Sequence, residues 1–152
     1  MLYVTGTVVG RAPQTVCIQR VEIEREKMKS KSLTPELVTE DIPGTIEFYT
    51  RILEFELDSV YPTNNPQWVQ FRCMNDYLMF ESRESLGNVI PEMNRVRIGG
   101  SFDIYIEVED IEELYENLKS KVEVVVPLQE SPFRQFAIKD VNGYVLLFGQ
   151  HG

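Results

Sequence analysis

A chain of 152 residues, 43% hydrophobic and 26% charged, fits one globular domain with a core of its own. Its formal net charge of −9 disfavours nucleic acid as a partner, because an acidic protein repels phosphates. No apolar run reaches the ~18 residues of a membrane span, and the first residues lack the basic region of a signal peptide. Two cysteines, Cys17 and Cys73, are too few for a disulfide framework, so reduced thiols and a cytoplasmic location are expected.

Residues 1–32 differ from the rest of the chain and are interpreted as an N-terminal extension. Two β-prone segments, Leu2–Val9 and Thr15–Ile23, flank a stretch with glycine and proline and could form a hairpin. A charged run then leads to Met28, an alternative start of the chain. Residues 1–27 are expected to be dispensable for the fold, because they lie outside the repeat described below.

From Leu33 onward the pattern predicts a strand, a helix and three strands. Leu33–Thr39 is β-prone, and Asp41 followed by Pro43 is typical of a helix start, with an N-cap side chain and a first-turn proline. Apolar residues at helical spacing continue the helix to about Leu53. The three segments that follow are β-prone, and the last two flank a tight turn: Phe55–Tyr61, Trp68–Cys73 and Tyr77–Glu81.

The same order of elements returns later in the chain. Phe102–Val108 predicts a strand, and Asp110 opens a second helix with apolar residues at helical spacing. Three further strands are predicted at Val122–Val126, Arg134–Lys139 and Tyr144–Phe148. The stretch between the two parts, residues 82–101, is interpreted as a linker that could hold one short turn.

Matching features recur at a nearly constant distance along the chain. Asp110 follows Asp41 by 69 residues, and in the terminal hairpins Leu146 follows Met79 by 67. Such regularity indicates an internal repeat. The sequence therefore predicts one α+β domain built from two tandem βαβββ modules. The domain spans residues 33–150, with halves 33–82 and 102–150.

Three segments carry motifs of a known family. They are EFYTRILEF at 47–55, EVEDIEELY at 107–115 and FRQFAIKDVNG at 133–143. They resemble the vicinal oxygen chelate superfamily, in its glyoxalase and bleomycin-resistance-protein branch. The resemblance implies the glyoxalase/bleomycin-resistance/dioxygenase fold, in which the modules form a curled mixed sheet around a cavity. The chain departs from the motifs at Glu54 and Val141, where glycine and proline are usual, and neither change is expected to threaten the fold.

Metal-dependent members of this family bind a divalent ion through the first and last strands of each half. By the motif spacing and the repeat, the four ligand positions correspond to Thr34, Phe80, Asp103 and Leu147. Only Asp103 is a good ligand type, whereas a catalytic ion needs three or four protein ligands, so no metal or other cofactor is expected. The alternative is a metal site in a shifted register, held by Glu36, Asp103 and Glu107. Because side chains alternate along a strand, these three acids could point into one cavity.

The remaining candidates are aromatic and acidic side chains around a cavity, which suit planar or cationic ligands. The predicted ligand-binding residues are Thr34, Glu36, Trp68, Phe80, Asp103, Tyr105, Phe133 and Leu147. Cys73 is interpreted as a core residue, and His151, the only histidine, as neither ligand nor base. No catalytic residue is assigned.

Three function classes stay open. The first is a non-catalytic protein, similar to bleomycin-resistance proteins, that sequesters a small cationic or planar aromatic molecule. The second is a glyoxalase- or dioxygenase-like enzyme that depends on a metal ion. The third is a ligand-sensing regulatory module. A homodimer is expected because members of the family commonly pair halves from two chains.

Overall fold

The computed structural model describes residues 31–100, 102–130 and 134–151. The chain divides into two units, Met1–Lys31 and Ser32–Gly152, and every described helix and strand belongs to the second. The predicted N-terminal hairpin and the predicted site residue Phe133 lie outside the described residues. In the part of the chain that the structure describes, no helix is long and apolar enough to cross a membrane.

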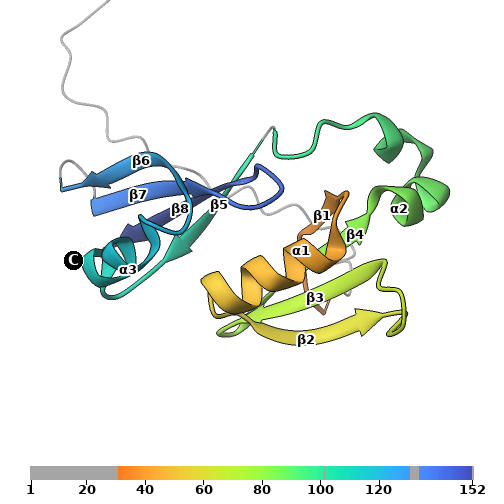
Figure 1. The fold of residues 1–152 in the computed structure, drawn as a ribbon, viewed down its shortest axis with the longest axis horizontal. Helices are drawn as coiled ribbons and strands as arrows, with labels where there is room; N and C mark the ends of the chain where they lie inside the picture. Colours follow the sequence, from red (N-terminus) through yellow and green to blue (C-terminus); the bar gives the residue numbers. More distant parts are fainter. Residues whose placement is uncertain (1–30, 101, 131–133, 152) are drawn as a thin grey trace, which may run out of the picture. The chain divides into compact units, whose positions relative to one another are not determined.

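The first half is a four-stranded sheet with a helix on one face (Figure 1). Its elements are β1 (Glu36–Thr39), α1 (Ile42–Glu47), the π-helical turn η1 (Phe48–Ile52), β2 (Glu56–Tyr61), β3 (Trp68–Cys73) and β4 (Asp76–Ser82). The strand order is β1-β4-β3-β2, with β1 parallel to β4 and the other pairs antiparallel. β1 begins only after Pro35, whose nitrogen has no proton to donate to a sheet.

The second half repeats this architecture. Its elements are β5 (Asp103–Glu107), α3 (Ile111–Leu118), β6 (Glu123–Gln129), β7 (Arg134–Lys139) and β8 (Val145–Gln150), in the order β5-β8-β7-β6. Again the first strand is parallel to the last. The prediction of an α+β fold with two βαβββ modules is therefore confirmed.

The linker between the halves is more ordered than predicted. It holds α2 (Arg83–Val89) and the 3₁₀ turn η2 (Pro91–Arg95). The Ser82 hydroxyl starts α2 by accepting a hydrogen bond from the Ser85 amide at 3.1 Å. The sequence analysis missed this N-cap, because glycine and proline in the same stretch indicated a linker.

The two predicted helix caps behave differently. Asp41 Oδ1 accepts a hydrogen bond from the Gly44 amide at 3.0 Å, as an N-cap carboxylate does. Asp110 occupies the N-cap position of α3, but its side chain makes no capping bond. Gln150 on β8 takes this role, because its Oε1 accepts a hydrogen bond from the Ile111 amide at 3.3 Å.

The two halves differ by one residue in the turn of their last hairpin. Arg72 pairs with Tyr77, five residues on, whereas Lys139 pairs with Val145, six residues on. Residues of β8 therefore follow the corresponding residues of β4 by 68 positions in the sequence, not by 67. A shift of one residue moves every side chain of a strand to the other face of the sheet.

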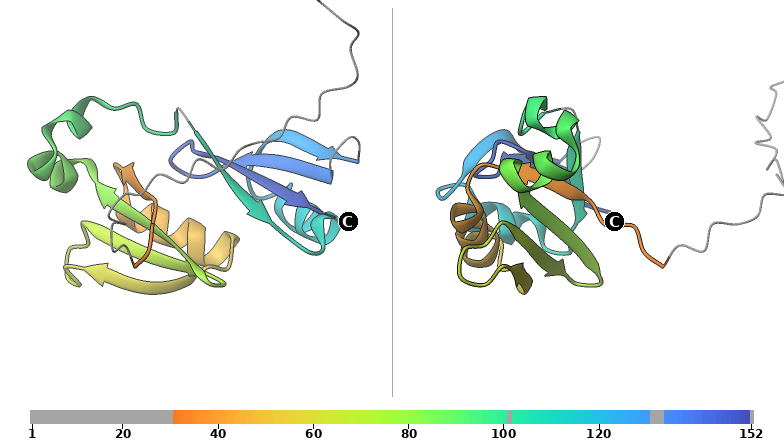
Figure 2. Two further views of the ribbon diagram at one scale, coloured as in Figure 1. Left: turned by 180° about the vertical axis from the view of Figure 1, so that it is seen from behind. Right: turned by 90° about the vertical axis from the view of Figure 1, so that its right-hand side faces the viewer.

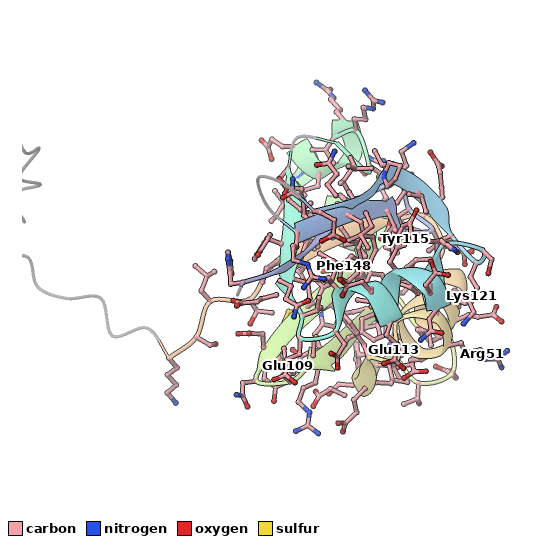
Figure 3. All side chains as sticks on the ribbon, turned by 90° about the vertical axis from the view of Figure 1, so that its left-hand side faces the viewer. Arg51, Glu109, Glu113, Tyr115, Lys121 and Phe148 are labelled. Carbon is pink, nitrogen blue, oxygen red and sulfur yellow. The ribbon has the colours of Figure 1, made fainter. Side chains whose placement is uncertain are left out.

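Aromatic side chains fill the core on the helix side of both sheets. Tyr49 of η1 stacks on Phe71 with ring centroids 5.1 Å apart and lies 5.0 Å from Phe80. In the second half Phe136 stacks on Phe148 at 4.9 Å. Phe148 is buried in this core and Tyr115 of α3 is partly buried against it; both are labelled in Figure 3. The same view places Arg51, Glu109, Glu113 and Lys121 around the outside.

A buried carboxylate joins the two halves. Asp140, only 6% exposed, accepts hydrogen bonds from the Tyr49 hydroxyl at 2.9 Å and from the amides of Asn142 and Tyr144 at 2.9 and 2.8 Å. Burial raises the pKa of Asp140, although these hydrogen bonds oppose the shift. Burial, with Asp140 beside it, also raises the pKa of Tyr49 well above its ordinary value.

A polar cluster lies next to this carboxylate. The Thr39 hydroxyl donates to Asn142 Oδ1 at 2.6 Å, and Asn142 Nδ2 donates to the Thr45 hydroxyl at 3.1 Å. The Tyr144 hydroxyl donates to the Val38 carbonyl at 3.1 Å. The last hairpin is thus tied to β1 and α1 by hydrogen bonds over long sequence distances.

Glu54 shows why glycine is usual at its position in the family motif. Its φ is 58°, in the left-handed region where a side chain is unfavourable. The side chain is exposed, so it clashes with no core residue. The substitution therefore carries a local backbone cost and leaves the fold intact.

Candidate functional site

The candidate site is a cavity of about 590 Å³ that residues of both halves line. Figure 2 shows the strands of the first half from behind, on the side turned away from α1. The cavity is open to solvent and mostly apolar, with a few polar groups at its wall. Its principal lining residues are Leu33, Met74, Asp76, Tyr77, Tyr105 and Glu107. We call it the inter-half cavity.

Two exposed tyrosines and two carboxylates give the inter-half cavity its chemical character. Tyr77, at the start of β4, is 39% exposed, and Tyr105, in the middle of β5, is 47% exposed. Asp76 and Glu107 add acidic groups, and none of the described lining residues is basic. This combination favours a ligand that is planar, cationic or both.

Tyr105 lies flat over a glycine and reaches the only histidine. Its hydroxyl is 3.0 Å from His151 Nε2, and the two rings lie 6.2 Å apart. A Cβ added to Gly149 would come within 2.3 Å of the Tyr105 hydroxyl. Gly149 therefore leaves the space that lets the tyrosine ring lie across the sheet. The sequence interpretation of His151 missed this contact, because β5 and the end of the chain are adjacent only in the folded sheet.

The structure brings together Glu36 and Trp68, two of the predicted ligand-binding residues. Trp68 Nε1 donates a hydrogen bond to Glu36 Oε1 at 3.0 Å. Glu36 lines a smaller pocket of about 340 Å³ beside the linker, which shares no lining residue with the inter-half cavity. The structure thus separates Glu36 and Tyr105, which the sequence analysis had assigned to one site.

The structure places Phe80 on a different face of the sheet from the one that the sequence analysis predicted. Its side chain is fully buried in the aromatic core between the sheet and η1, so it cannot line a ligand site on the opposite face. The sequence placed Phe80 at a last-strand ligand position because the repeat offset of 67 ignored the longer second turn. With the offset of 68, the residue that corresponds to Leu147 is Met79.

The other predicted residues have ordinary surroundings. Leu147 is half-buried and pairs with Tyr105 across the parallel strands β5 and β8. Thr34 is half-buried in the segment before β1, and Asp103 is exposed at the start of β5. The Tyr105 hydroxyl is hydrogen-bonded to His151. A ligand-binding role for these three residues stays a prediction.

Cys73 lines the inter-half cavity without the properties of a nucleophile. Burial and the nearby Asp76 raise the pKa of its thiol above the ordinary value. A raised pKa keeps the thiol protonated, and the thiolate is the reactive form. Cys73 is therefore a wall residue of the cavity.

The family's metal positions do not fit a metal ion. With the corrected register they are Thr34, Met79, Asp103 and Leu147, which offer one carboxylate and one hydroxyl beside a thioether and an alkyl group. Hard catalytic cations need several oxygen or imidazole ligands. The alternative acids Glu36, Asp103 and Glu107 do not form a ligand cluster either. Within residues 31–100, 102–130 and 134–151, no three His, Cys, Asp or Glu side chains are grouped so that they could hold an ion.

The fold and the cavity define a class of two-module α+β proteins with a ligand-sized space between the modules. The family model described as the Glyoxalase/Bleomycin resistance protein/Dioxygenase superfamily matches residues 31–148. The chain belongs to this superfamily, as its motifs indicated. A comparison with curated proteins gives no match.

Solved structures share the fold at low sequence identity. A hypothetical protein, SA1046, from S. aureus is 20% identical with a TM-score of 0.67, over 80% of this chain and 94% of that one. The bleomycin-binding protein from Streptomyces verticillus, in complex with copper(II)-bleomycin, is 22% identical with a TM-score of 0.56, over 83% and 100%. TnmS3, an antibiotic binding protein from Streptomyces sp. CB03234, is 18% identical with a TM-score of 0.65, over 83% and 100%. These structures show that the chain has the fold of the superfamily.

Proposed function

We propose that this protein binds a small cationic or planar aromatic molecule in the inter-half cavity and sequesters it without metal or chemical change. The observation that carries the proposal is the wall of that cavity, where Tyr77 and Tyr105 lie with Asp76 and Glu107 and no described basic residue. A volume of about 590 Å³ is typical of pockets for drug-sized ligands.

Physical chemistry favours a cation in this setting. The face of a tyrosine ring attracts a cation, and carboxylates at the wall add Coulomb attraction. The net charge of −9 raises the local concentration of cations around the whole protein. The neighbours named as bleomycin-binding and antibiotic-binding proteins support a role of this kind for a related fold.

The test is a titration with three probes of similar shape. Proflavine is a planar cation, 9-anthracenemethanol is neutral and 9-anthracenecarboxylate is an anion. We expect proflavine to bind most tightly. Replacing Tyr77 or Tyr105 by alanine should weaken proflavine binding about tenfold, and Glu107→Gln about three- to tenfold, because ring faces and a partly solvated charge are lost. Fluorescence titration measures each affinity.

A matched control separates the cavity from the general acidity of the protein. Glu113 lies exposed on the outside of α3, so Glu113→Gln changes the net charge equally and should leave proflavine binding unchanged. Equal effects of Glu107→Gln and Glu113→Gln, or equal affinity for the cation and the anion, would contradict the proposal. Copper(II)-bleomycin is a further probe, chosen for the neighbour solved with it.

The proposal includes a homodimer in the cytoplasm. Large apolar side chains lie exposed on the sheets, among them Tyr61 at 72%, Leu57 at 42% and Val125 at 43%. Such side chains on edge strands invite pairing with another chain. Light scattering at micromolar concentration should give about twice the chain mass of 17.6 kDa. The mass of a single chain would remove the dimer from the proposal.

A further inference from the structure

The linker between the halves forms one wall of the smaller pocket. Met93, Val96, Arg97 and Phe102 face Glu36 and Val38 of β1 across a space of about 340 Å³. We call it the linker pocket. Its volume lies at the low end of the range of about 300–1,000 Å³ for ligand pockets, so it suits a small molecule.

Hydrogen bonds hold this wall in place. One Arg83 nitrogen donates to the carbonyls of Met93 and Val96, both at 3.0 Å, and the Arg83 Nε pairs with Glu40. Asn94 Nδ2 donates to the Gly87 carbonyl at 3.2 Å and ties η2 to α2. These bonds tie the linker backbone to α2 and to Glu40.

The floor of the linker pocket is apolar. Val38 is 2% exposed, and Tyr144 donates its hydroxyl proton to the Val38 carbonyl. The ring of Phe102 lies 5.7 Å from that of Tyr144 and remains half exposed at the side of the pocket. An apolar or aromatic group of a ligand would fit against these side chains.

Two side chains of opposite charge line the linker pocket without an ion pair between them. Glu36 is oriented by Trp68, which binds its Oε1 and leaves Oε2 available. The stem of Arg97 lies over Gly100, with Cδ 3.6 Å from the place where a Cβ would be. Within the described part of the chain, neither Glu36 nor Arg97 forms an ion pair with any residue.

We propose that the linker pocket binds a small zwitterion with an apolar side group, such as a free apolar α-amino acid. The ammonium group binds Glu36, the carboxylate binds the Arg97 guanidinium, and the side group packs on Val38 and Phe102. A guanidinium presents paired donors that match a carboxylate, whereas the glutamate accepts from an ammonium group. This site is separate from the inter-half cavity and does not depend on the function proposed for it.

The experiment is a calorimetric titration of the full chain with L-phenylalanine and two relatives that each lack one charge. N-acetyl-L-phenylalanine has no cation, and L-phenylalaninamide has no carboxylate. We expect L-phenylalanine to bind at least about tenfold more tightly than either, because each lost charge removes a charge-assisted hydrogen bond. Arg97→Gln should weaken L-phenylalanine binding by at least about tenfold and leave L-phenylalaninamide unchanged.

Arg95 provides a matched control, because it is also exposed on the linker but does not line the pocket. Arg95→Gln should leave L-phenylalanine binding unchanged, and L-phenylalanine should not displace proflavine. Failure of L-phenylalanine to bind at millimolar concentration overturns the proposal, as does binding that is insensitive to Arg97→Gln. Displacement of proflavine would move the ligand to the inter-half cavity and would also overturn it. The L-phenylalanine titrations of the wild type, Arg97→Gln and Arg95→Gln do not depend on whether proflavine binds, and only the displacement test does.

Discussion

Asp140→Ala is expected to lower the free energy of unfolding by about 3–5 kcal/mol, a large loss for the substitution of a single polar residue. The variant leaves the Tyr49 hydroxyl and the amides of Asn142 and Tyr144 without their acceptor at a buried position. Each orphaned buried donor costs about 1–3 kcal/mol, and partial relaxation reduces the sum. Urea denaturation followed by circular dichroism measures the change.

The pH dependence gives a second readout for the same carboxylate. Because burial raises the folded-state pKa of Asp140, the folded protein holds this proton more tightly than the unfolded chain does. The stability contributed by Asp140 is therefore greatest at low pH and decreases as the pH rises from the ordinary aspartate pKa through the raised one. The difference in unfolding free energy between wild type and Asp140→Ala should narrow over that interval.

Asp110→Ala is the control for this prediction. Asp110 is exposed and its side chain makes no capping bond, so its replacement should change stability by no more than about 0.5 kcal/mol. Equal losses in the two variants would mean that Asp140 does not join the halves as described. A difference that widens with rising pH would contradict the direction of its pKa shift.

Phe80→Ala is expected to destabilise the protein by about 3–5 kcal/mol, because it leaves a cavity in a fully buried aromatic cluster. Its neighbour Met79 is half-buried and points to the other face of the sheet. Met79→Ala should cost only about 1 kcal/mol, since less apolar surface is lost. Chemical denaturation of both variants checks the pair.

This pair of variants also tests the register of the last hairpins. If Met79→Ala proved the more damaging change, Phe80 would face the opposite side of the sheet, as the offset of 67 had implied. The expected order of losses instead follows from the additional residue between Lys139 and Val145 in the second turn.

The sequence by itself determined the two-module architecture, because the signals involved are local. Asp41 caps its helix through a bond to an amide three residues away, and β-prone segments alternate with turn residues whatever their tertiary surroundings. The repeat of these signals indicated the duplication, and the short motifs indicated the superfamily. Helix and strand order required no information from distant parts of the chain.

Only the tertiary structure decided which side chains share a site. One additional residue in a turn reversed the face of Phe80, and the path of the linker placed Arg97 opposite Glu36. The contact between Tyr105 and His151 joins residues 46 positions apart, and the bond between Tyr49 and Asp140 joins residues 91 apart. Periodicity specifies which face of its own element a residue occupies, whereas a binding site depends on how separate elements pack, and the sequence pattern carries no local record of that packing.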